Sequence, residues 1–408
     1  MKTVDDKSPY FYPSRTIEIK TSESRILTPT RAASLYEFNQ KIAIPAITPI
    51  DNPISISVRK MNWKKLKIFL NQNGLYKNWF RQIIDSEDMM KYSSFRAHVM
   101  QPTTSKIILK NDDGTVQKDA KGKTKTEPSG VDFLAENPTL RNRFVRLILK
   151  MQLDAGLDVI TVPYLKFPIS EYEKFITEIA REIRSQNKEP LFVFDLDYQE
   201  RGDRFEDAMS FFINKADIKL MAFPNRSFLS SAVSYDILSQ YVTKDVAFFT
   251  FEVEREDKSN DEISKMHYFP FIGNDVYSVK TPRYVPDPNK PEVQASKEAI
   301  KFFNPSNLLI EQSAIRLKQP RKILDEMKEA GDKWLNDIIG DYDIIGKDPD
   351  RIAVISALSK VHELKTSSAE FNEVQKRVVS GESTEYIKEK THLEATLTKL
   401  KTKKRGSR

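Results

Sequence analysis

The sequence predicts an α/β protein built as a (β/α)8 barrel of the TIM type, with a hairpin insert and a helical C-terminal extension. Three observations support this fold. Between Leu157 and Arg255, four short apolar runs alternate with segments of helical periodicity, which is typical of buried parallel strands joined by helical crossovers. About eight strand candidates fall within roughly 270 residues, the size of such a barrel. No glycine-rich phosphate loop is present, which counts against an open nucleotide-binding sheet.

The N-terminal part is expected to lead into the barrel. Residues 1–24 are polar and lack periodicity, so they are predicted to form an extended arm. The barrel itself is predicted over residues 25–315. Its first strand is placed at 44–50 or at 54–58; the second segment alternates cleanly, whereas prolines in and near the first restrict it to a strand end or edge.

A strand is predicted at 95–101, and a low-hydrophobicity insert follows at 103–130. The insert contains an Asp-Asp-Gly turn between apolar residues and is then rich in lysine, so it is predicted to be a β-hairpin with a flexible tip. A strong helix is expected over 138–155, with Pro138 in its first turn. Its solvent face carries several basic residues, which is the usual composition of an exposed helix face.

The four central strands and the elements after them follow from apolar runs and helical spacing. The central strands are predicted at 158–164, 191–198, 218–225 and 246–254. Short strands are then predicted at 266–272 and 276–279, a helix at 296–303, and a last strand at 307–313. Residues 316–408 are rich in Lys, Glu, Leu and Ile, and they predict a helical C-terminal region that ends in a basic tail.

Composition excludes several functional classes. The chain of 408 residues has no cysteine, so disulfides, thiolate zinc sites, iron–sulfur clusters and cysteine nucleophiles are excluded. With four histidines, a metal site would be rich in carboxylates and would favour magnesium or manganese; no particular cofactor is predicted. The net charge of +7 permits binding to tRNA or DNA. No apolar run or leader suits a membrane, so a cytoplasmic location is expected.

Polar residues follow the central strands where each strand ends. Because active sites of parallel barrels lie at the carboxyl ends of the strands, these residues are candidates for one site. Asp195 and Asp197 are the candidate acid and base, since two carboxylates at i and i+2 point to the same side. Glu252 and Glu254 repeat this spacing, and Glu252 is the third catalytic candidate. The alternative for each pair is a carboxylate held by a neighbouring arginine.

The remaining candidates are substrate-binding residues. Tyr164 and Lys166 follow the first central strand, and Asn225 and Arg226 follow the third; an arginine at such a place suits a phosphate or carboxylate. Arg96 and His98 alternate on one face of the strand at 95–101. For His98, a buried structural role is the alternative to a place in the site.

The predicted barrel, the segment Leu27-Thr-Pro-Thr-Arg31, the prolines at 45 and 49 and the strand-end Asp195 resemble the tRNA-guanine transglycosylase-like barrels over about residues 25–315. The resemblance implies one carboxylate that attacks a ribose carbon and another that handles protons and the base. Asp195 or Asp197 would fill one of these roles. The zinc site of that family uses three cysteines and a histidine, whereas this chain has no cysteine.

Three functional hypotheses follow. The first is an enzyme with carboxylates at the strand ends that transfers a glycosyl group or exchanges a base on a nucleoside or nucleic acid. The second is a hydrolase that depends on a divalent metal. The third is a non-catalytic protein whose C-terminal helices bind a partner, a nucleic acid or a second copy of the chain.

Overall fold

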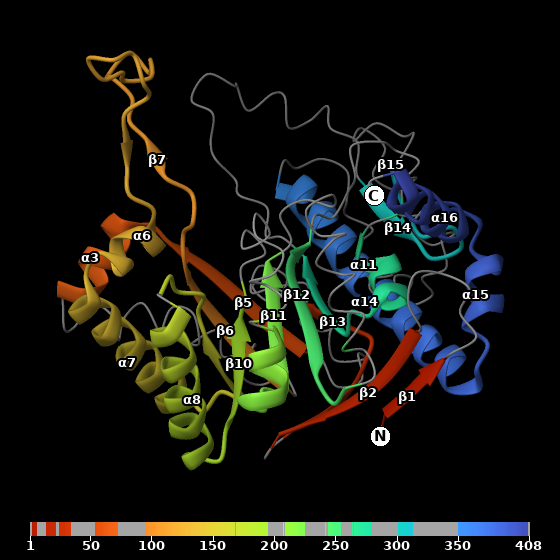
Figure 1. Ribbon diagram of the computed structural model, residues 1–408. Helices are drawn as coiled ribbons and strands as arrows, with labels where there is room; N and C mark the ends of the chain where they lie inside the picture. Colours follow the sequence, from red (N-terminus) through yellow and green to blue (C-terminus); the bar gives the residue numbers. More distant parts are fainter. Residues whose placement is uncertain are drawn as a thin grey trace.

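Eight parallel strands form the centre of the molecule (Figure 1), in the order β6-β5-β4-β13-β12-β11-β10-β9. The structure is a computed structural model. It describes residues 2–5, 14–21, 24–33, 54–71, 95–167, 169–194, 207, 209–224, 241, 244–253, 263, 265–279, 301–312 and 350–406. The barrel strands are β4 Thr30–Ala33, β5 Ile54–Met61, β6 Phe95–Pro102, β9 Val159–Val162, β10 Glu189–Val193, β11 Leu220–Pro224, β12 Ala247–Val253 and β13 Val276–Val279.

The two end strands of this sheet, β6 and β9, also lie side by side. The backbone N–H of Arg96 donates to Asp158 Oδ2 at 2.7 Å, and Thr161 donates through its hydroxyl to the carbonyl of His98. Each strand is therefore next to its successor around a nearly closed ring. The predicted (β/α)8 barrel is confirmed.

Two hydrophobic layers explain why these apolar runs become barrel strands. Alternate residues such as Ile56, Val99 and Phe249 point inward and pack together inside the ring. Their neighbours in the strands, such as Ile160 and Phe192, point outward and pack against the surrounding helices. Both faces of the central strands β9 to β12 are therefore buried over most of their length, as their continuous apolar runs predict.

Helices cover the outside of the barrel between the strands. Within the described residues, the helices between β5 and β13 are α3 Trp63–Asn71, α6 Gly130–Ala135, α7 Pro138–Asp154, α8 Ile169–Ser185, the π-helical turn η2 Phe211–Lys215, α11 Lys265–Tyr268 and the 3-10 turn η3 Phe269–Ile272. Helix α7 packs on β9 and α8 packs on β10. The predicted helix at 138–155 is thus found with nearly the same bounds.

The N-terminal segment is more than an extended arm. Strands β1 Lys2–Asp5, β2 Ser14–Lys20 and β3 Arg25–Leu27 form an antiparallel sheet, which lies at the bottom of Figure 1. The first barrel strand is β4, which the sequence analysis missed, because its four residues (TRAA) contain no apolar run. The alternative at 44–50 lies outside the described residues, and the strand expected at 54–58 is β5.

Two of the later predictions were wrong, and a third was right about the strand but not about its place in the barrel. Residues 266–272 are helical rather than extended, and Gly273, with φ +92°, ends the turn. A short apolar run does not distinguish a buried strand from a buried helical turn. The last predicted strand is β15 Leu309–Gln312, but it pairs with β14 Lys301–Asn304 outside the barrel. Residues 301–303, expected in a helix, therefore belong to β14.

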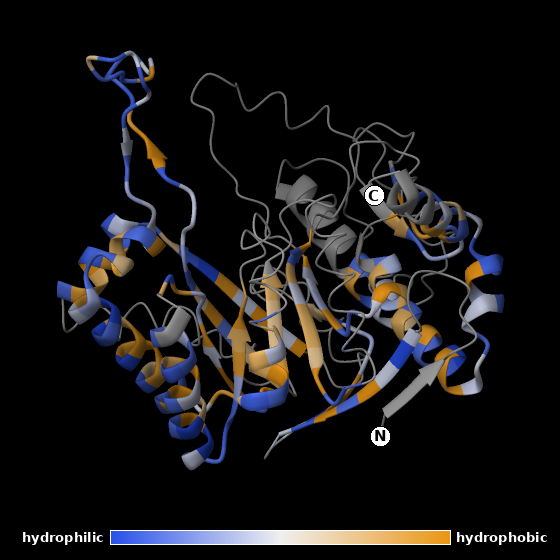
Figure 2. Ribbon diagram, in the orientation of Figure 1, coloured by the Kyte–Doolittle hydropathy of each residue, from blue (hydrophilic) through white to orange (hydrophobic). Residues whose placement is uncertain are grey.

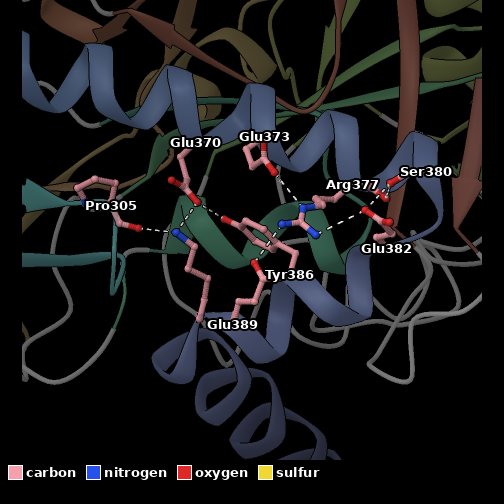
Figure 3. A network of polar contacts seen from close by, with 9 residues as sticks. Pro305, Glu370, Glu373, Arg377, Ser380, Glu382, Tyr386 and Glu389 are labelled. Atoms are coloured by element: carbon pink, nitrogen blue, oxygen red, sulfur yellow. Dashed lines mark hydrogen bonds and ion pairs between the residues drawn. The ribbon is translucent and has the colours of Figure 1, made fainter. Parts of the chain in front are cut away.

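The described part of the C-terminal extension, residues 350–406, is helical, as predicted, with α14 Asp350–Ser380, α15 Ser383–Glu389 and α16 Thr391–Gly406. Helix α14 packs against β4 and β14, and Gln375 donates to the carbonyls of Leu27 and Pro29 at 3.0 and 2.8 Å. A polar network joins α14 to α15 (Figure 3), in which Tyr386 donates to Glu370 at 2.6 Å. These contacts attach the extension to its own barrel.

The insert is a hairpin, as predicted, in which β7 Ile107–Ile108 pairs with β8 Thr126–Glu127. It projects away from the barrel at the top left of Figure 1. None of the helices in the part of the chain that the structure describes is long and apolar enough to cross a membrane.

Candidate active site at the C-terminal end of the barrel

The end of the barrel at the amino termini of the strands is closed. Ile19 of β2 and Ile26 of β3 pack within the cluster that fills the ring. Beside them, Arg15 donates to both oxygens of Asp275, through Nε at 3.0 Å and Nη2 at 2.5 Å. Asp275 in turn accepts the backbone N–H of Phe248 at 2.7 Å. Because this end is sealed, a substrate would reach the barrel from the carboxyl ends of the strands, here called the mouth.

Lys60 and Glu252 meet at the mouth. Lys60 Nζ lies 2.5 Å from Glu252 Oε2, and the two side chains are 32% and 17% exposed. They come from β5 and β12, which are separated in the sheet by β4 and β13. The ion pair therefore crosses the barrel rather than joining adjacent strands, and it remains open to solvent.

A bulge in β12 directs Glu252 to this place. The register of β12 against β13 shifts between Thr250 and Val253, and Glu252 has φ +58°. Phe251 packs inside the ring and Val253 packs outside it, so the extra residue lets Glu252 also turn inward. Positive φ is unfavourable for a residue with a Cβ, and such bulges and strained residues concentrate next to active sites.

Lys60 reaches the mouth by simple alternation. Ile54, Ile56 and Val58 of β5 pack in the inner cluster, and Lys60 continues this series at the end of the strand. Lys60 is not predicted from the sequence, because the apolar pattern, and with it the predicted strand, stops at residue 58. Continued pairing through Met61 with β6 extends the strand beyond that pattern.

Gln101 and Tyr164 form part of the wall at the mouth. Gln101 Nε2 donates to the carbonyl of Tyr164 at 3.1 Å, and Gln101 Oε1 accepts the backbone N–H of Tyr164 at 2.9 Å. Tyr164 packs within the inner cluster. The amide of Gln101 therefore fixes the segment after β9. Gln101 is also not among the residues predicted from the sequence. It continues the alternation of Ala97 and Val99, which places it on the inner face of β6.

Lys166 lies further along the same segment and is 61% exposed. Its Nζ lies 3.3 Å from Asp132 Oδ1, at the start of α6. Burial would raise the pKa of Asp132, but hydrogen bonds from Ser129 and Lys166 and the charges of Lys166 and Lys106 outweigh it and lower the pKa. The structure thus places Lys166 at the rim, where it pairs with α6.

The structure places Arg96 and His98 away from the mouth. Both lie on the outer face of β6, because Phe95, Ala97 and Val99 face inward. Arg96 is at the start of the strand, where its Nη2 donates to the carbonyl of Gly156 at 2.6 Å. His98 is buried between the barrel and its helices, and burial, with a smaller contribution from the charge of Arg59, lowers its pKa to about 3.

Five predicted site residues lie outside the described residues: Asp195, Asp197, Asn225, Arg226 and Glu254. The strands that precede them, β10, β11 and β12, do form and pair in parallel. Of the catalytic candidates, Glu252 is therefore the one whose surroundings are known. Within the described ranges, no group of three or more His, Asp or Glu side chains could hold a metal ion.

Comparison with known proteins gives no family. No protein-family model matches the chain, and no curated protein matches it. Among solved structures, a malate synthase of Haloferax volcanii in complex with lead(II) is 7% identical, with a TM-score of 0.33, over 91% of this chain and 99% of that one. A putative fructose-1,6-biphosphate aldolase of Coccidioides immitis is 9% identical, with a TM-score of 0.34, over 88% and 94%. The fold assignment rests on the strand order, and these similarities add nothing to it.

Proposed function

We propose that this chain is an enzyme that acts on a glycosidic bond of a nucleoside or nucleic acid, with its active site at the mouth. The observation that supports this proposal is the ion pair between Lys60 and Glu252, for which β12 adopts a strained bulge. A strained backbone at a partly exposed carboxylate is better explained by chemistry than by stability, because an ion pair that is still in contact with solvent contributes little to folding.

The pair suits the breaking of a glycosidic bond. As the bond between the anomeric carbon and the leaving group breaks, its electrons go with the leaving group, which takes up a proton, and positive charge develops on the sugar ring. Glu252 would face that positive charge, and Lys60 would hold its carboxylate in place. Asp195 and Asp197, expected from the sequence at the end of the strand that contains β10, would supply the nucleophile and the proton donor. The resemblance to the transglycosylase-like barrels supports the same assignment.

A glycosidase and base-exchange assay tests this proposal. The purified chain is incubated with nucleosides, tRNA and DNA, and released base and incorporated labelled base are measured. We expect turnover by the wild type and a loss of at least about 100-fold in Glu252→Gln, the usual effect of removing a catalytic proton-transfer or charge-stabilising group. Lys60→Met is expected to reduce turnover less, because it leaves the carboxylate in place.

The matched control is Glu189→Gln. Glu189 also forms a partly exposed ion pair, with Arg184 at 3.2 Å, but it stands at the amino end of β10. We expect this variant to keep full activity. No turnover by the wild type on any of these substrates, or equal activity in the Glu252 and Glu189 variants, would contradict the proposal.

A further inference from the structure

The hairpin insert, residues 103–130, is an ordered projection here called the lysine arm. Beyond its paired stem, three backbone hydrogen bonds close a ring at the tip. Leu109 N–H donates to the carbonyl of Lys125 at 3.0 Å, Lys125 N–H to that of Gln117 at 2.8 Å, and Gln117 N–H to that of Leu109 at 2.9 Å. The tip is therefore a compact ribbon of three short segments.

Two tight turns connect these segments, and in each turn an aspartate side chain accepts hydrogen bonds. Asp113 accepts the backbone N–H and the hydroxyl of Thr115 at 2.8 and 2.6 Å, and Asp119 Oδ1 accepts the N–H groups of Lys121 and Lys123 at 2.9 and 2.8 Å. These bonds from Thr115 lower the pKa of Asp113. The two carboxylates are committed to the turns.

The lysines of the arm point into solvent. The six exposed lysines are Lys106, Lys110, Lys118, Lys121, Lys123 and Lys125. Residues 105–126 contain these six lysines and three aspartates, so the projecting part has a surplus of three positive charges. No ion pair joins any of the six to a carboxylate in the described ranges. Figure 2 shows the tip as largely hydrophilic, and Ile108 and Val116, which are 52% and 41% exposed, are exceptions.

The base of the arm is fixed to the mouth. Thr103 N–H donates to the carbonyl of Met61 at 2.9 Å, and Val131 N–H donates to the carbonyl of Thr103 at 3.0 Å. A Cβ on Gly130 would lie 2.5 Å from the carbonyl oxygen of Met61, so the return of the chain here requires glycine. Met61 directly follows Lys60. The arm is thereby attached to the barrel at the same end as the proposed active site.

We infer that the lysine arm binds the phosphodiester backbone of duplex nucleic acid. The arm buries almost no surface, and such small β-hairpins are only marginally stable alone. The arm therefore adds little to the stability of the protein, and stability does not account for its presence. A β-ribbon fits the major groove, and lysines contact phosphates without regard to sequence. A second copy of the chain is a poor partner, because the whole protein carries a net charge of +7 and would repel a positive arm.

This inference deepens the proposed function, because it identifies a polymer as the carrier of the glycosidic bond, and to that extent it rests on that function. The binding itself does not depend on the chemistry. The test is therefore made with the full-length Glu252→Gln protein, which is expected to bind without turning over. Labelled DNA and RNA duplexes are titrated at several salt concentrations, and fluorescence anisotropy gives the affinity; comparing the two identifies the preferred nucleic acid.

The test variant carries Lys118→Gln, Lys121→Gln, Lys123→Gln and Lys125→Gln. The matched control removes four exposed positive charges elsewhere, with Lys174→Gln, Arg181→Gln, Lys215→Gln and Lys388→Gln. We expect the arm variant to bind at least about tenfold more weakly. Its log–log salt slope should be shallower by up to about 0.9 for each phosphate that a lysine no longer neutralises. The control should keep most of the affinity and slope.

A third protein, in which residues 109–125 are replaced by Asn-Gly, shortens the arm to its stem and should lose the same binding. Circular dichroism and thermal unfolding establish that each variant keeps the barrel. Equal weakening in the arm and control variants, or no binding by the parent protein, would overturn the inference. So would a dimer that depends on the arm without any binding of nucleic acid.

Discussion

Arg15 and Asp275 form a completely buried ion pair that joins β2 to the residue before β13. Arg15 also donates to the carbonyl of Val246 at 2.9 Å, and its guanidinium lies 5.0 Å from the centre of the Phe248 ring. The pair therefore links the N-terminal sheet to the starts of two barrel strands. It explains why this end of the barrel is closed by residues far away in the sequence.

Removing one partner of this pair should destabilise the protein strongly. Arg15→Met leaves the Asp275 carboxylate buried without its cation, and we expect a loss of about 3–5 kcal/mol in the free energy of unfolding. Urea unfolding followed by circular dichroism measures it. The control is Arg184→Met, at a partly exposed ion pair, which should cost less than about 1 kcal/mol. A similar loss in the free energy of unfolding for both variants would show that the buried pair stabilises the protein no more than an exposed one.

At the bulge, we expect glycine to be more stable than alanine in place of Glu252. Inside a strand, glycine is normally less stable than alanine by roughly 0.5–1 kcal/mol. At φ +58° this order should reverse, because alanine has a Cβ that disfavours positive φ and glycine has none. We therefore expect Glu252→Gly to be more stable than Glu252→Ala by about 1 kcal/mol, measured by thermal or urea unfolding.

Both substitutions remove the ion pair with Lys60, so the difference between them reports the backbone alone. A comparison at Phe251, the inward-facing residue before the bulge, provides the control. There, the glycine variant should be less stable than the alanine variant. If glycine is also the less stable residue at position 252, the bulge is not strained in solution.

The sequence predicts the barrel because strong apolar runs recur in β9, β10, β11 and β12. It does not predict β4, whose Thr30–Ala33 segment has no apolar pattern and becomes a strand through pairing with β13 and β5. The sequence likewise predicts residues 301–303 as helix and 307–313 as a barrel strand, whereas β14 and β15 pair with each other outside the barrel. Pairing partners distant in the sequence decide these cases, and local pattern does not show them.

In the candidate site too, local sequence pattern predicts only part of the arrangement. Strict alternation in β12 places Glu252 and Glu254 on one face, whereas the bulge separates Glu252 from the alternation of the residues before it. Lys60 could have been found by continuing the alternation of β5 beyond Val58 to the charged end of the strand. Arg96 and His98 share a strand face, as predicted, but nothing in their local sequence shows that this face is the outer one.

Because two of its histidines are buried, we expect the protein to become less stable in acid. Burial lowers the pKa of His98 to about 3, and it lowers that of His267 to about 3 as well, although the charge of Glu363 opposes the effect. In the unfolded chain both have a pKa of about 6.5. Between these values the unfolded state binds more protons, so stability is complete above about pH 6.5 and falls as the pH decreases.

Each histidine should cost about 2 kcal/mol between about pH 7 and about pH 5, because each bound proton contributes about 1.4 kcal/mol for each pH unit. The ring of His267 stacks on that of Phe303 at 4.4 Å, so His267→Phe keeps an aromatic ring there while removing the titrating group. Urea unfolding at both pH values should show a smaller pH effect in this variant than in the wild type. An unchanged pH effect in His267→Phe would mean that His267 is not held neutral by burial.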